Sequence, residues 1–278
     1  MPLTHQNRLT ITVWYCIIFY ALMVYKWTNG QWLYQLKPHL YNTRFDISTW
    51  VLMKTGIHTW LLDNLTGWLF FDAAFYFLPL LYLIFYKKKE IVAIVLAAVM
   101  LLVNFIYITC YTLYPASSIE SFIPWLVFPF LFMSATLDRF YFILHGLRYF
   151  FLFLIASAAL WKIVQYGIFN TQEMSGILLV QHKEYLVSSP DDWYGSFVYW
   201  LISHSRVSYL LYLAAVVVEI TFLVGFFTKK YDRLFIALFV LFLVMDVLIM
   251  RIPYMELTPF VLTLVYSKYG EPTTTVKS

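Results

Sequence analysis

The chain carries little charge for its length. Only 12% of its 278 residues are Asp, Glu, Lys or Arg, whereas soluble domains carry about 25%. A water-soluble particle of this size has to cover itself with polar groups, so the composition excludes a soluble globular domain. The net charge of +4 provides no basic stripe of the kind that nucleic acid requires, so nucleic-acid binding is excluded as well.

Cysteine is also scarce. The only two, Cys16 and Cys110, lie in separate apolar runs, with no CxxC motif and no Cys/His cluster. This pattern excludes a thiol-redox or zinc site and predicts two small buried apolar side chains. We therefore expect no metal centre.

Apolar residues are abundant in their place. They make up 62% of the chain, the mean hydropathy is +0.73, and the aromatic share is 21%. Amphipathic rings gather at the two interfaces of a bilayer, which accounts for part of the aromatic excess. The composition predicts an all-α, polytopic integral membrane protein surrounded by lipid.

Eight segments are apolar enough to be membrane spans, each of which needs about 20 residues. They are residues 9–26, 65–86, 90–113, 119–137, 144–166, 207–227, 231–250 and 252–267. The fourth and eighth are the weakest, because both contain proline and the eighth is short. The first run meets Tyr25-Lys26-Trp27 rather than a small-residue cleavage site, so we expect an uncleaved first span.

The distribution of Lys and Arg among the loops predicts the orientation. The side that holds both termini and the loops after spans two, four and six carries eleven basic and four acidic residues. The opposite side carries eight of each. Because cytoplasmic loops are enriched in Lys and Arg, we expect both termini in the cytoplasm, and we predict a bacterial inner membrane.

Two long segments, 27–64 and 167–206, then lie outside. Both are rich in Trp, Tyr and Leu rather than in linker residues. In the second, Asn170 stands three residues before Glu173, a spacing typical of a helix start. We expect amphipathic helices at the outer interface or folded over the bundle.

The two halves of the chain resemble each other in order and spacing. Lys26 and Lys162 close the first span of each half, His58 precedes Asp72 by 14 residues, and His204 precedes Glu219 by 15. Asn104 and Asp246 occupy matching places later on, and Glu120 loosely matches Glu256. This predicts two tandem four-helix units of the same orientation, residues 1–140 and 141–278.

Three acidic residues, Asp72, Glu219 and Asp246, fall inside spans, where a charge costs about 2.5–3.5 kcal/mol and needs a partner or a wet cavity. One interpretation is a hydrated acidic cavity with Lys162 and Lys26 as counter-charges. Glu219, Asp72 and Lys162 are then the catalytic candidates and Asp246 a ligand-binding one. The alternative is a set of interhelical salt bridges, with Lys162 bound to Glu219 and Asp246 to Arg251.

Other polar residues are weaker ligand-binding candidates. The paired His58 and His204 invite haem ligation, but we favour interfacial histidines because both lie near helix ends outside the spans. Arg148 opens the fifth span on the cytoplasmic side, where anionic lipid headgroups attract it. Asn104, in mid-span, needs a hydrogen-bond partner on another helix, and Glu256 lies in the proline-bearing eighth span.

Several motifs of the second half resemble known families. Leu147-Arg148, Ala156-Ser157-Ala158-Ala159 and Trp161-Lys162 are similar to the first helix of DoxX-like proteins. The stretch from Glu219 to Thr228 resembles the helix of that family that ends in Gly and Thr before a basic turn. Residues 246–253 resemble the HTTM domain, the membrane part of vitamin K-dependent γ-carboxylase-like proteins. The resemblance covers about residues 145–266.

The resemblance implies three kinds of function. DoxX-like proteins include maturation factors and quinone-linked oxidoreductase subunits, so the first expectation is an accessory or assembly factor for a membrane or exported protein partner. The second is a membrane-embedded enzyme subunit acting on a quinone or lipid. The third, from the repeat and the paired proline-bearing spans, is a small-solute transporter. No lysine-based carboxylase motif is present, which argues against carboxylation.

Overall fold

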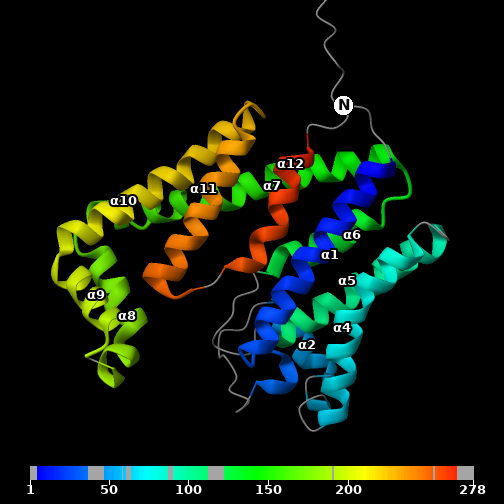
Figure 1. Ribbon diagram of the computed structural model, residues 1–278, viewed down its shortest axis with the longest axis horizontal. Coiled ribbons are helices and arrows are strands. Elements are labelled where there is room, and N and C mark those ends of the chain that lie inside the picture. The colour runs from blue at the N-terminus through cyan, green and yellow to red at the C-terminus, as the bar shows by residue number, and fades with distance from the viewer. Residues whose placement is uncertain are drawn as a thin grey trace, which may run out of the picture. The chain divides into compact units, whose positions relative to one another are not determined.

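The computed structural model describes residues 5–36, 47–57, 59–60, 64–86, 90–111, 122–189, 191–252 and 254–267. Throughout these ranges the regular structure is helical and contains no β-strand, which confirms the all-α prediction (Figure 1). Cys16 and Cys110 are both buried free thiols.

Six helical segments of the described chain are long and apolar enough to cross a bilayer, so the protein is an integral membrane protein. They are Gln6–Gln35, Thr66–Phe85, Glu90–Tyr111, Leu137–Val164, Ser205–Phe226 and Asp232–Met250. The two weakest predicted spans correspond to shorter apolar helices, Ile123–Phe132 and Met255–Tyr266. A full crossing by either of these two stays a prediction.

The chain forms two compact units, one of residues 1–147 with 255–278 and one of residues 148–254. We call them the first and the second unit. The boundary falls inside one long helix, α7 (Leu137–Val164). The last helical segment therefore packs with the N-terminal helices, while the duplication into residues 1–140 and 141–278 stays a prediction.

The first unit is built around an aromatic core. Its elements are α1 (His5–Thr28), η1 (Leu33–Gln35), α2 (Ile47–Thr55), α4 (Leu65–Phe85), α5 (Glu90–Tyr111), α6 (Ile123–Phe132), η6 (Met255–Phe260) and α12 (Val261–Tyr266). Phe75 stacks on Tyr107 with ring centroids 3.8 Å apart, and Phe19 and Trp125 pack against Phe75. The short helices α6 and η6 contact each other, with Phe128 and Phe260 centroids 6.5 Å apart. Buried rings, each of which covers a large apolar area, thus form a main part of this core.

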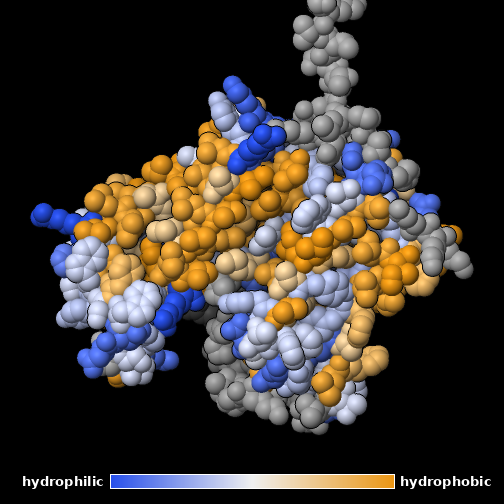
Figure 2. All heavy atoms as spheres, viewed as in Figure 1, coloured by the Kyte–Doolittle hydropathy of each residue, from blue (hydrophilic) through white to orange (hydrophobic). Residues whose placement is uncertain are grey.

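The second unit combines long apolar helices with a shorter helical hairpin. Its elements after α7 are η3 (Gly167–Phe169), α8 (Glu173–Ser188), α9 (Trp193–Ser203), α10 (Ser205–Thr221), η4 (Phe222–Phe226), α11 (Asp232–Met245) and a short π-helix, η5 (Asp246–Met250). The helix predicted from Asn170 and Glu173 is present as α8, and the two side chains bond at 2.8 Å. Apolar residues dominate the visible surface of α10 and α11, while the α8–α9 hairpin is paler and bluer (Figure 2).

Candidate functional site

The central feature of the second unit is an ion pair between α7 and α10. Lys162 Nζ lies 2.5 Å from Glu219 Oε1, so the interhelical bridge predicted from the sequence is formed. The Glu219 side chain is 1% exposed and that of Lys162 is 28% exposed. The ammonium also lies 5.6 Å from the centroid of the Tyr212 ring. Close packing fixes this ring, because a Cβ at Gly167 would collide with the Tyr212 hydroxyl.

Two carboxylate oxygens near this pair have no hydrogen-bond partner. They are Glu219 Oε2 and Asp246 Oδ2, both buried within the described part of the chain. Asp246 lies within electrostatic range of Lys162 and Glu219. The alternative pairing of Asp246 with Arg251 does not form among the described residues. Asp246 and Glu219 thus each keep a free acceptor atom within electrostatic range of the same ammonium.

Arg251 instead lies between two tyrosine rings of the α8–α9 hairpin. Its guanidinium carbon is 4.1 Å from the Tyr185 centroid and 3.9 Å from that of Tyr194. Tyr194 Oη donates to the Ile249 carbonyl at 3.2 Å, and His182 Nε2 bonds the same oxygen at 2.9 Å. Burial raises the pKa of Tyr194, so its hydroxyl keeps the proton that it donates. These contacts tie the hairpin to the end of α11 and η5.

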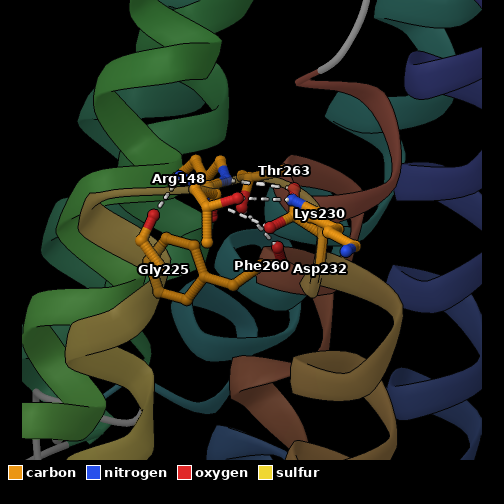
Figure 3. Close-up of polar contacts among 7 residues, drawn as sticks. Arg148, Gly225, Lys230, Asp232, Phe260 and Thr263 are labelled. Carbon is orange, nitrogen blue, oxygen red and sulfur yellow. Dashed lines mark hydrogen bonds and ion pairs between the residues drawn. The ribbon is translucent and has the colours of Figure 1, made fainter.

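Arg148 is fully buried in a second ion pair (Figure 3). Its Nε and Nη2 donate to Asp232 Oδ2 and Oδ1 at 3.1 and 2.5 Å. Nη1 donates to the Gly225 carbonyl at 3.0 Å and Nη2 to that of Thr228 at 3.1 Å. The planar guanidinium thereby joins α7 to the end of η4 and the start of α11, using the fork geometry that lysine lacks. All these donors bond inside the chain, and binding of a lipid headgroup by Arg148 stays a prediction.

Asp72 lies in the first unit and accepts uncharged donors. Tyr107 Oη donates to its Oδ1 at 2.7 Å, and the Tyr34 backbone N–H donates to its Oδ2 at 3.1 Å. Tyr76 Oη lies 3.0 Å from Tyr107 Oη and extends the network. Among the described residues no Lys, Arg or His forms an ion pair with Asp72. Asp72 therefore fastens η1 to α4 and α5.

Glu256 holds the other buried lysine. Its Oε1 lies 2.5 Å from Lys26 Nζ, and the two side chains are 8% and 9% exposed. The ammonium also lies 4.9 Å from the Tyr111 centroid and 5.1 Å from that of Phe122. This pair joins α1 to η6. It also shows that Lys26 and Lys162, at matching places in the predicted repeat, bind acids at non-matching places.

The remaining predicted residues either make polar or ring contacts or lie outside the described part of the chain. Asn104 Nδ2 donates to the Trp125 carbonyl at 2.6 Å, so it has the expected partner on another helix, α6. His204 joins α9 to α10, and its ring stacks on Trp200 at 4.8 Å. His58 lies outside the described residues, so its comparison with His204 stays untested. In the described ranges no group of three His, Cys, Asp or Glu residues is placed to bind a metal.

Sequence reasoning missed two of these contacts. The count of loop charges includes Asp232 among the four acidic residues of the cytoplasmic side, although it is the first residue of α11 and is buried against Arg148. The acid at a helix N-terminus after a basic turn was the available signal. The Arg251–Tyr194 contact had no signal, because tyrosine carries no charge that would mark it as a partner.

Comparison of the chain with protein-family models, with curated proteins and with solved structures finds no match.

Proposed function

We propose that the chain is a DoxX- and HTTM-like accessory protein that supports assembly or maturation of a membrane or exported protein partner. One observation carries the proposal: Lys162 and Glu219 are in direct contact at 2.5 Å. That distance leaves no room for a quinone or lipid headgroup between the two charged atoms. The pair that is best placed for catalysis thus holds two helices together.

The other buried charges support the same function. Arg148 binds Asp232 and Lys26 binds Glu256, and each pair joins segments far apart in the sequence. Buried ion pairs add little net stability, but in some proteins they specify one arrangement of elements. A scaffold needs such a fixed arrangement to present a constant surface.

The α8–α9 hairpin supplies a surface for a partner. Leu179, Val180 and Val187 of α8 are 51%, 69% and 83% exposed. They alternate with the exposed Lys183 and Glu184, which gives this face apolar contacts and charged groups for orientation. We place the contact with the protein partner on this face of α8.

Affinity purification from native membranes in a mild detergent tests the proposal. We expect a partner at a fixed stoichiometric ratio, and we expect the substitutions L179S and V187S together to release it. The matched control G176A lies on the same helix but adds only a methyl group in open space. Recovery of the wild-type chain without any stoichiometric partner would contradict the accessory function.

A second candidate function rests on the unpartnered oxygens. Glu219 Oε2 and Asp246 Oδ2 are buried acceptors within electrostatic range of Lys162, and a buried acceptor without a donor is costly. A quinol or a lipid hydroxyl would supply donors at that place. The chain would then be a subunit of a quinone- or lipid-linked enzyme, with Glu219 as the group that accepts a proton. Unchanged quinone binding and unchanged membrane-dependent activity in the E219Q variant would exclude this role.

A further inference from the structure

The helix α9 has two apolar faces, of which one is buried and the other is exposed. Tyr194, Val198 and Leu201 are buried in the second unit. On the neighbouring face, about 100° around the helix axis, Trp193, Phe197 and Trp200 are 75%, 38% and 46% exposed. They follow one another at intervals of four and three residues, so they form one stripe along the helix. We call these three residues the aromatic stripe.

The buried face of α9 fixes the direction in which the stripe points. Tyr194 is held by the Ile249 carbonyl at 3.2 Å and by the Arg251 guanidinium, 3.9 Å from its ring centroid. Val198 is completely buried and Leu201 is 1% exposed. Because these contacts prevent rotation of the helix about its axis, the stripe cannot turn inward.

The end of α9 fixes where the stripe lies along the chain. The helix stops at Ser203, His204 has non-helical angles (φ −102°, ψ 65°), and α10 begins at Ser205. The chain turns at this residue, so α9 leaves the line of α10 instead of prolonging it (Figure 1). His204 secures the turn, since its backbone N–H donates to the Trp200 carbonyl at 2.9 Å. The aromatic stripe therefore borders the end of a candidate membrane span.

We infer that the aromatic stripe inserts into the lipid headgroup region of the bilayer, on the side where α10 begins. The candidate span that follows the stripe also exposes apolar side chains, since Leu210 and Val217 of α10 are 65% and 60% exposed. α9 contains no charged residue, so this face has none of the groups that keep an exposed helix in water. Indole rings favour the headgroup region because they join an apolar surface to an N–H donor. The α8–α9 hairpin is thereby anchored to the membrane surface through α9.

Site-directed spin labelling of the full chain in vesicles of phosphatidylethanolamine and phosphatidylglycerol tests the anchor. One label replaces Phe197 through F197C, and a control label replaces the exposed Lys183 of α8 through K183C, both in a background that carries C16A and C110A. We expect the label at 197 to collide more often with lipid-soluble oxygen and less often with a water-soluble nickel complex than the label at 183. Equal access to the nickel complex at both positions would overturn the inference.

A second measurement covers the case in which the label at 197 disturbs the helix. Nitroxide lipids quench tryptophans near the nitroxide, and we expect W193F with W200F to reduce the quenching by a lipid labelled near its headgroup. The same pair should leave quenching by a lipid labelled at its chain end unchanged. An equal loss of quenching with both lipids would contradict a headgroup location. No loss of quenching with either lipid would contradict it as well. The vesicles contain no other protein, so the result is independent of the partner proposed above.

Discussion

At the scale of single residues, three buried acids in the described part of the chain, Glu219, Asp232 and Glu256, form ion pairs inside the chain. Lys162 forms an ion pair with Glu219, and Arg148 forms one with Asp232. In each pair the acidic side chain is 1% exposed. Separating such a pair leaves a charge in a medium that solvates it poorly, which costs about 3–5 kcal/mol in buried pairs. The cost is larger when the charge that is left without a partner is buried than when it is exposed to water.

The Lys162–Glu219 pair should respond unequally to loss of its two members. K162M strands the buried carboxylate, whereas E219M strands an ammonium that is 28% exposed. We expect K162M to lower the free energy of unfolding by about 3 kcal/mol and E219M to lower it by less. The double variant K162M/E219M should recover most of the loss. Reversible unfolding in detergent measures all three variants, and a double variant as unstable as K162M would contradict the pairing.

Arg148 should not tolerate lysine. R148K keeps the charge, but a single ammonium cannot reproduce the two bonds to Asp232 together with those to the Gly225 and Thr228 carbonyls. We expect R148K to lower the free energy of unfolding by about 2 kcal/mol or more, because buried carbonyls lose their donors. R139K on the exposed start of α7 is the matched control. Equal melting temperatures for R148K and R139K would show that the charge alone suffices.

The residue types in the sequence predict some of these contacts and not others. The sequence predicts the Lys162–Glu219 bridge because both residues are ionisable inside apolar runs, where a partner is obligatory. It does not predict the environment of Asp72, since Tyr107 and a backbone N–H serve where a cation was expected. Nor does it identify Asp232 as the partner of Arg148, because the two residues are 84 positions apart in the sequence.

At the scale of elements, close packing at the end of α10 depends on Gly225. A Cβ there would lie 2.7 Å from Leu152 Cδ2 and 3.0 Å from Phe235 Cε2. Leu152 is completely buried and Phe235 is 2% exposed, so neither has space into which to move. The glycine lets α7 and η4 approach closely enough for Arg148 to reach the Gly225 carbonyl.

Alanine should therefore act in opposite directions at two glycines. We expect G225A to destabilise the protein by about 1–3 kcal/mol through overpacking. G176A, in the exposed interior of α8 with no heavy atom within 4 Å of the added methyl, should be neutral or stabilising by up to about 1 kcal/mol. Thermal unfolding compares the two variants. A tolerated G225A would show that α7 and η4 are not in close contact.

The two weakest predicted spans show what apolar composition can and cannot predict. Apolarity located both, and both are short helices that contain proline: Pro129 lies inside α6 and Pro259 inside η6. The sequence could not show that both belong to the first unit, because that depends on contacts of η6 with α1 and α6, which lie far away in the sequence.

At the scale of the whole molecule, composition alone predicted an all-helical membrane protein, and the six long apolar helices confirm it. Orientation is a separate matter, decided by charge in the loops. The turn after η4 carries Lys229 and Lys230, while the α8–α9 hairpin belongs to the segment that is predicted to lie outside. The two places should therefore face opposite sides of the membrane.

Accessibility of single cysteines in intact cells tests this topology. A cysteine at Lys230 should react with a membrane-impermeant thiol reagent only after the cells are opened. A cysteine at Ser188, near the end of α8, should react before lysis. Both side chains are exposed, so burial does not protect either position. The reverse pattern would place the basic turn outside and overturn the orientation.

The accessory function depends most directly on what lies between Lys162 and Glu219. An electron-density map of the protein purified from native membranes with its lipids retained would show this place. We predict the two side chains in direct contact, as in the 2.5 Å ion pair, with no other density between them. Density for a quinone or a lipid headgroup between the ammonium and the carboxylate would contradict the account and favour an enzyme.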